Sequence, residues 1–243
     1  MILAQLSDPH VRLGPGEERS AAALAAGVRA VAQWRPVPDA LLVTGDLANE
    51  GTPAEYERVR ELLAPLEMPV HVLPGNHDDR DALRAAFPVD GDGDGQYRYA
   101  VDVGGHRLVA CDSSIPGRPE GRLDLEWLEA QLGDGPAIVA MHHPPFAIGM
   151  PGLDGIGLDA ASSSGLAELL GRSPQVRLVT AGHVHRAAST AWGGAPAFAC
   201  PSVHLATRLQ IGAPDYEIGD DPPAFALHVE AGDAIVSHVQ PIG

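Results

Sequence analysis

The sequence contains no lysine: all sixteen of its basic residues are arginines, set against 32 aspartates and glutamates. The arginines form no basic run, whereas binding along a nucleic-acid backbone requires clustered cations. This composition excludes a long nucleic-acid partner. Because the formal net charge is −16, an anionic substrate would need a local source of positive charge, and bound divalent ions are usually the largest charges in their site.

Cysteines and long apolar stretches are equally scarce. Cys111 and Cys200 lie in separate apolar runs without CxxC spacing, so we interpret both as buried apolar side chains rather than as a disulfide. No window reaches the roughly 18 apolar residues of a membrane span, and the N-terminus does not read as a signal peptide. We therefore expect a cytoplasmic protein without a membrane partner.

The chain of 243 residues is long enough for one large domain, and no linker or internal repeat divides it. Aromatic residues make up only 5% of it, so the core is expected to be mostly aliphatic. We predict a single domain over 1–243. Its tail, from about 205 to 243, is expected to add strands, to form a loop at the substrate or to carry the contacts of a homodimer, and these alternatives stay open.

Short apolar, β-branched runs alternate with amphipathic helical patterns in the first half, which is typical of βαβ units and a largely parallel sheet. The second helix begins with a capping box formed by Thr52 and Glu55, with proline at the first helical position. Strands are predicted at 2–6, 40–44 and 70–73, and helices at 20–34 and from Thr52 to about Leu66.

After Phe87 the pattern changes to Gly- and Asp-rich turns, which indicate an antiparallel hairpin and hence a second sheet. The segment from Asp90 to Gly95 is interpreted as a turn and not as a calcium loop, because Val101 stands where the bidentate glutamate should be. The other expected elements are a hairpin at 97–103 and 107–111, helices at 124–132 and 166–170, strands at 137–141 and 176–181, and more strands within 197–239.

Five apolar runs each end in a group of Asp, His or Asn residues. In α/β proteins, sites form beyond the carboxyl ends of the strands, so groups far apart in sequence can meet in one pocket. Side chains two apart in an extended segment point the same way, which pairs Asp8 with His10 and His183 with His185. The groups are Asp8 and His10, Asp46, Asn76 to Asp78, His142 and His143, and His183 and His185.

The donors in these groups are carboxylate, imidazole and amide oxygen, with no thiolate. Such donors favour Mn, Fe, Zn or Mg over copper(I) or iron–sulfur clusters. Two divalent ions held by the aspartates would leave a small net positive charge, which suits an anionic phosphate in an acidic protein. We therefore expect two metal ions, whose identities the sequence does not decide.

The series DxH, GD, GNHD, H and GHxH, in this order over 1–204, resembles the calcineurin-like metallophosphoesterase superfamily. Longer stretches, among them GDLANEGTPAEYERVRELL, LPGNHDDR, HHPPF and CPSVHLATRLQ, are similar to its bacterial class III branch of cyclic-nucleotide and glycerophosphodiester phosphodiesterases. The resemblance implies the α/β fold of the metallo-dependent phosphatases, a four-layer αββα sandwich in which helices flank two mixed β-sheets.

The resemblance also implies a role for each site residue. His77 would be catalytic and would stabilise or protonate the departing oxygen, while Asn49 and His204 would face the substrate. A hydroxide bridging two ions would attack phosphorus, with no covalent enzyme intermediate. The implied metal ligands are Asp8, His10 and His185 on one ion, Asn76, His142 and His183 on the other, and Asp46 on both.

The implied activity is hydrolysis of a small phosphodiester, either a cyclic nucleotide such as 3',5'-cAMP or a glycerophosphodiester. A phosphomonoesterase of broad specificity is the alternative, because a two-metal site tolerates both esters, and a non-catalytic scaffold of the same fold is a third. Beside the ligands, His143 is expected to have a structural or supporting role. Asp78 and Asp79 are expected to cap the following helix.

Overall fold

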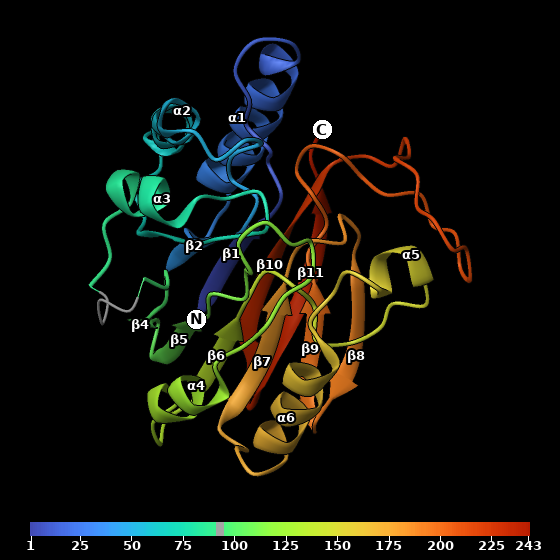
Figure 1. Ribbon diagram of the computed structural model, residues 1–243. Coiled ribbons are helices and arrows are strands. Elements are labelled where there is room, and N and C mark those ends of the chain that lie inside the picture. Colours follow the sequence, from blue (N-terminus) through green and yellow to red (C-terminus); the bar gives the residue numbers. More distant parts are fainter. Residues whose placement is uncertain (91–94) are drawn as a thin grey trace.

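The computed structural model describes residues 1–90 and 95–243. Two mixed β-sheets pack face to face in it, with helices on their outer sides (Figure 1), which confirms the predicted αββα sandwich. The first sheet has the order β11 (Ala234–Pro241), β10 (Ala224–Ala231), β1 (Ile2–Leu6), β2 (Ala40–Thr44) and β3 (Val70–Leu73). The second has the order β4 (Tyr99–Val103), β5 (His106–Ala110), β6 (Ala137–Ala140), β7 (Val176–Ala181), β9 (Ala195–Ala199) and β8 (Ala188–Trp192).

The helices divide between the two outer faces. Those beside the first sheet are α1 (Glu17–Gln33), α2 (Pro53–Leu63) and α3 (Arg80–Ala86), whereas α4 (Leu125–Gln131) and α6 (Ala160–Gly171) lie beside the second, and α5 (Pro151–Asp154) stands apart near one end (Figure 1). Among the helices of the described residues, none combines the length and the apolar character that crossing a bilayer requires.

The sequence of the central strands explains why both faces of the second sheet are covered. Along β5, Leu108 and Ala110 join the cluster that includes the first sheet, while Val109 and Cys111 join the cluster of α4 and α6. Because alternate side chains point to opposite faces, a strand that is buried on both faces reads as a continuous apolar run. Cys111 and Cys200 are buried and unpaired, as predicted.

Local sequence signals account for several boundaries. The capping box of α2 is confirmed: the Thr52 hydroxyl accepts from the Glu55 amide at 3.3 Å, and the Glu55 carboxylate accepts from the Thr52 amide at 3.0 Å. The helix predicted at 166–170 begins earlier, at Ala160, because Asp159 caps it by accepting from the Ser162 amide. The strand β8 and the short helix α5 were not predicted, whereas α3 is the helix that was expected to follow Asp78 and Asp79. Residues 91–94 of the predicted turn lie outside the described residues.

A buried polar network joins the two sheets beneath the ends of their strands. Gln5 on β1 donates to the Thr44 hydroxyl at 2.8 Å and to the Ala181 carbonyl at 3.1 Å. Its carbonyl oxygen accepts from the Thr180 hydroxyl at 2.6 Å and from the His228 ring at 2.8 Å. Burial lowers the pKa of His228 to about 3, so this ring is neutral. The network therefore fixes the positions of β1, β2, β7 and β10 relative to one another.

Replacing Gln5 by leucine should lower the free energy of unfolding by about 3 kcal/mol, the upper end of the range for buried polar groups left without a partner. Urea denaturation monitored by circular dichroism measures this. Gln175→Leu is the matched control, because the side-chain amide of Gln175 lies at the surface, where it donates to the Gly133 carbonyl. Equal and small effects of the two substitutions would contradict the structural role of the network.

Candidate metal centre

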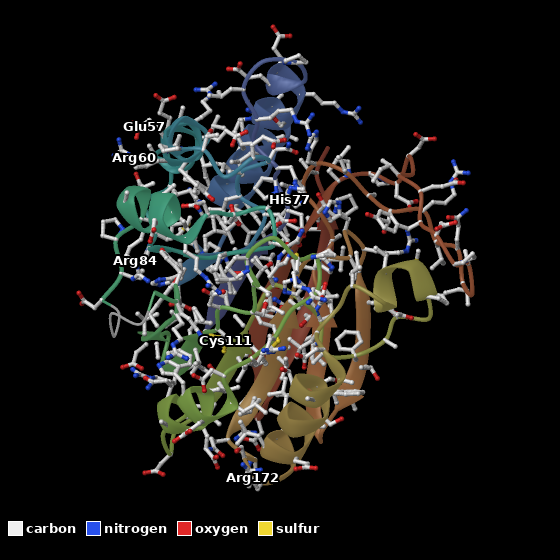
Figure 2. The ribbon with its side chains drawn as sticks, in the orientation of Figure 1. Glu57, Arg60, His77, Arg84, Cys111 and Arg172 are labelled. Carbon is white, nitrogen blue, oxygen red and sulfur yellow. The ribbon has the colours of Figure 1, made fainter. Side chains whose placement is uncertain are left out.

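The loops that follow the parallel strands carry the predicted ligands to one end of the sandwich. The loops after β1 and β2 run side by side, because the His10 amide donates to the Asp46 carbonyl at 2.9 Å and the Val11 amide donates to the Leu47 carbonyl at 3.0 Å. His77, labelled in Figure 2, lies beyond the ends of the central strands on this side of the molecule.

The backbone at the predicted ligands is unusual. Among the described residues, the only non-glycine residues with positive φ are five of these ligands: Asp8 (53°), His10 (43°), Asp46 (49°), His183 (70°) and His185 (52°). Left-handed backbone is disfavoured for side-chain-bearing residues, although Asp and His tolerate it better than most. Such conformations persist where the surrounding structure imposes them, and they cluster at functional sites.

Glycines allow the loops to approach one another. A side chain at Gly75 would place its Cβ 2.5 Å from the backbone nitrogen of Asp46, and one at Gly45 would collide with the His142 ring. Glycine is therefore required by close contact immediately before Asp46 and before Asn76.

Four ligand-type side chains form a first group, Asp8, His10, Asp46 and His185, whose donor atoms all lie within 4.8 Å of one another. The Nε2 atoms of His10 and His185 are 3.1 Å apart. Nε2 of His10 lies 3.4 Å from Oδ2 of Asp46, and Nε2 of His185 lies 3.4 Å from Oδ1 of Asp8.

A second group surrounds Nε2 of His142. This atom lies 3.2 Å from Oδ1 of Asn76 and 3.2 Å from Nδ1 of His183. It also lies 3.5 Å from Oδ2 of Asp46, the same oxygen that contacts His10. A single carboxylate oxygen of Asp46 therefore stands between the two groups.

Backbone groups hold these side chains in position. One oxygen of Asp46 accepts from the His77 amide at 3.0 Å, which leaves the other for the two groups of donors. The His142 ring is oriented by its Nδ1, which donates to the Thr44 carbonyl at 2.9 Å. Hydrogen bonds of this kind fix the ring nitrogen that faces a metal.

The protonation states of the groups fit cation binding. Burial lowers the pKa of His10 to about 4 and that of His183 to about 3, so both rings offer lone pairs at neutral pH. Burial alone would raise the pKa of Asp46, but His142 and His10 outweigh it and hold this pKa well below its usual range. Burial would lower the pKa of His142, yet Asp46 raises it to about 9. His10 and His183 thus offer lone pairs directly, whereas His142 would release its proton when a cation binds. Together with the carboxylate oxygens, these imidazoles form a donor set that suits hard to borderline divalent ions.

Comparison with known proteins agrees with this geometry. A profile of the calcineurin-like phosphoesterase family matches residues 1–187. The chain belongs to the calcineurin-like phosphoesterase family. This confirms the expected resemblance and the expected class of enzyme, a metal-dependent phosphoric ester hydrolase.

Named relatives of this phosphoesterase lie in the expected branch. The chain is 34% identical to the glycerophosphodiester phosphodiesterase GpdQ of Enterobacter lignolyticus, over 98% of this chain and 90% of that protein. It is 32% identical to the 3',5'-cyclic adenosine monophosphate phosphodiesterase CpdA of Pseudomonas aeruginosa, over 93% and 84% of the two chains. A dimetal phosphatase from Danio rerio shares the fold, with a TM-score of 0.76 at 16% identity over 100% of this chain and 96% of that one.

The site of this calcineurin-like phosphoesterase opens into a cavity of about 320 Å³. The predicted residues Asn49 and His77 line it together with metal-side residues from both groups. His204 is 8% exposed and does not line the cavity, whereas its neighbour Leu205 does. The full lining is His10, Asp46, Asn49, Asn76, His77, Pro119, Leu153, Ile156, His183, His185, Leu205, Thr207, Tyr216 and Ile218.

The two aspartates after His77 have different roles, which corrects one prediction. Asp79 caps α3 by accepting from the Ala82 amide at 2.9 Å, as predicted. Asp78 does not cap that helix; it accepts from the amides of Leu47, Ala48 and Gly75 at 2.8–3.2 Å. Burial, reinforced by Asp46, raises its pKa to about 6. Asp78 therefore joins the Asp46 loop to the Asn76 loop, a role that only the crossing of the two loops reveals.

His143 supports the site without offering it a free nitrogen. Its Nδ1 lies 2.8 Å from the Ser113 hydroxyl and its Nε2 lies 3.1 Å from the Pro119 carbonyl. The ring is fully buried and packs 4.6 Å from the His183 ring, centroid to centroid. The ligand-type atoms of His142, His143 and His183 lie within 4.8 Å of one another. Both nitrogens of His143 already have hydrogen-bond partners, however, whereas Oδ1 of Asn76 lies 3.2 Å from Nε2 of His142.

Asp46→Ala should weaken metal binding at both groups of donors, because Oδ2 of Asp46 contacts both. Asn76→Ala should weaken mainly the binding of a metal ion beside His142. Elemental analysis of manganese after dialysis of Asp46→Ala and Asn76→Ala measures this. Asp102→Ala is the control, since Asp102 is an exposed carboxylate on β4 and should leave the metal content unchanged. Equal metal loss in the Asp46 and Asn76 variants would contradict the shared position of Asp46.

Proposed function

We propose that this phosphoesterase uses two metal ions to hydrolyse a small phosphodiester, either a cyclic nucleotide or a glycerophosphodiester. The observation that carries the proposal is that one carboxylate oxygen of Asp46 contacts both groups of donors. Asp46 and His77 also line the same cavity. The printed names of the relatives, a glycerophosphodiester phosphodiesterase and a cyclic adenosine monophosphate phosphodiesterase, support the substrate class.

The two donor groups divide the proposed ligands as follows: Asp8, His10 and His185 would hold one ion, Asn76, His142 and His183 would hold the other, and Asp46 would bind both. Mn, Fe, Zn or Mg would suit this donor set. Paired ions of this kind lower the pKa of a shared water and neutralise the phosphoryl oxygens during an in-line displacement. The chain's own task is to hold the diester over the donors and to deliver a proton to the departing oxygen.

His77 is placed for that proton transfer. Its Nδ1 donates to the backbone carbonyl of Asn49 at 2.9 Å. The other ring nitrogen, Nε2, is therefore the one that can contact the substrate. Its ring stands edge-on to His10, with centroids 4.8 Å apart, so it lies beside the donors without joining either group. A protonated Nε2 can donate to the ester oxygen as the bond to phosphorus breaks.

The charges around the cavity favour a diester over a monoester. None of the described residues that line it is an arginine, so the ions would be the main positive charge that meets the phosphate. A diester carries one negative charge and a monoester up to two, and a site with a small net positive charge matches the diester better. The phosphomonoesterase remains the alternative.

Manganese-loaded protein should cleave bis-p-nitrophenyl phosphate with a higher kcat/KM than p-nitrophenyl phosphate. Release of nitrophenolate measures both. Preference for the monoester would reject the phosphodiesterase in favour of the monoesterase. Failure to cleave either ester, with both metal positions filled, would favour the non-catalytic scaffold.

His77→Ala should lower kcat by about 10²–10⁴-fold, the range for a positioned general acid, while the metal content stays unchanged. Steady-state kinetics together with elemental analysis separate the two effects. His238→Ala is the matched control, because His238 is an exposed histidine on β11. Unchanged kcat in the His77 variant would remove its proposed role.

The cytoplasmic location and the homodimer stay predictions. We infer a single domain over 1–243, because β10 of the tail pairs with β1 of the N-terminus.

A further inference from the structure

Part of the cavity lining is apolar. Five hydrophobic side chains from two segments form this part: Leu153 and Ile156 from α5 and its following turn, and Leu205, Tyr216 and Ile218 from the tail. Pro119 completes this wall. The substrate's phosphate would face the donors, so the wall would meet one of the two ester arms.

The tail segment is anchored to the metal centre itself. Residues 205–219, here called the strap, fold back on themselves through a bridge between Thr207 and Ile218 and a bond from the Arg208 amide to the Glu217 carbonyl at 2.8 Å. The Thr207 hydroxyl donates to the carbonyl of Val184 at 2.7 Å, and Val184 stands between His183 and His185. The position of the apolar wall is therefore tied directly to the proposed ligands.

The strap also packs on the segment that carries the rest of the wall. The Gly212 amide donates to the Gly149 carbonyl at 2.9 Å, and the Gly152 amide donates to the Ala213 carbonyl at 3.4 Å. A side chain at Gly152 would collide with the backbone of Pro214 and Asp215. The two apolar segments therefore form one continuous surface over the cavity.

Two of the polar side chains that line the cavity, Asn49 and Thr207, already have hydrogen-bond partners within the protein. The side-chain oxygen of Asn49 accepts from the Arg12 guanidinium at 2.5 Å, and the side-chain amide of Asn49 donates to the Glu50 carboxylate at 2.6 Å. The Thr207 hydroxyl donates to the Val184 carbonyl. The hydroxyl groups of a glycerol arm would find few partners here. Tyr216 is 47% exposed and lines the cavity, so an aromatic face is available in place of polar groups.

We propose that the strap and the α5 segment form a subsite for a flat aromatic group on the ester arm, a nucleobase, and that Tyr216 is the residue on which it stacks. The subsite rests on the proposed phosphodiesterase function and narrows its substrate to base-bearing diesters. Leu153, Ile156 and Ile218 supply the apolar surround. Stacking on an aromatic side chain tolerates different bases, because every base has a π-face, so the subsite selects a nucleotide over a glycerol ester more strongly than one base over another.

Binding of two monophosphates to manganese-loaded protein tests the subsite without turnover. AMP and ribose 5-phosphate differ only by the base, so isothermal titration should show AMP binding roughly 5- to 100-fold more tightly, the range expected from loss of one stacked base. Tyr216→Ala should remove most of this difference by weakening AMP alone. Tyr216→Phe should retain it, because the ring is kept.

Leu209→Ala is the matched control, since Leu209 is on the same strap and 55% exposed but does not line the cavity; it should leave both affinities unchanged. Equal binding of AMP and ribose 5-phosphate by the unaltered protein, or equal weakening of both by Tyr216→Ala, would overturn the subsite. Hydrolysis of bis-p-nitrophenyl phosphate by the unaltered protein separates the two claims. If it is intact and the affinities are equal, only the subsite is wrong; if no diester is cleaved, the proposed function fails and the subsite with it.

Discussion

The convergence of carboxylates and imidazoles on Asp46 is the constraint on which the rest of the structure depends. Asp8 and Asp46 are buried, and desolvation of a carboxylate is costly unless positive charge or hydrogen bonds compensate it. Backbone amides supply part of this compensation, because Asp46 accepts from the His77 amide and Asp8 accepts from the His183 amide. Positive charge supplies more: against the effect of burial, Asp46 raises the pKa of His142 to about 9, and Asp8 raises the pKa of His185. Five of the proposed ligands, Asp8 and Asp46 among them, are also held in left-handed backbone, which costs about 1–3 kcal/mol each. The proposed cations would offset both costs.

The fold supplies the rigidity that such an arrangement needs. The Gln5 network sets β1 and β2 against β7, so the loops that leave these strands start from fixed positions. Asp78 then binds the Asp46 loop to the Asn76 loop through three backbone amides. On the open side, Thr207 attaches the strap to the loop of His183 and His185. Each attachment joins segments that are far apart in sequence, so the site and the sandwich stabilise one another.

Local patterns predicted much of this from the sequence. Strand ends followed by Asp, Asn or His located the seven proposed ligands, and the Thr52 capping box located the start of α2. The prediction was wrong for Asp78, because a carboxylate before a helix resembles a cap, and only the neighbouring loop shows that it binds Leu47, Ala48 and Gly75 instead. The strap was left open between three roles because it has no periodicity, and the stretch CPSVHLATRLQ, which ends within it, predicts no secondary structure. Its lining of the cavity depends on tertiary contacts that no local pattern encodes.

The central claim is that Asp46 is shared by two cations. Anomalous diffraction from crystals of the manganese-loaded protein measures this most directly. We expect two manganese peaks roughly 3.5–4 Å apart, the usual spacing in two-metal sites, one beside His10 and the other beside His142, with the Asp46 carboxylate between them. A single peak at full occupancy, or two peaks of which only one contacts Asp46, would contradict the account.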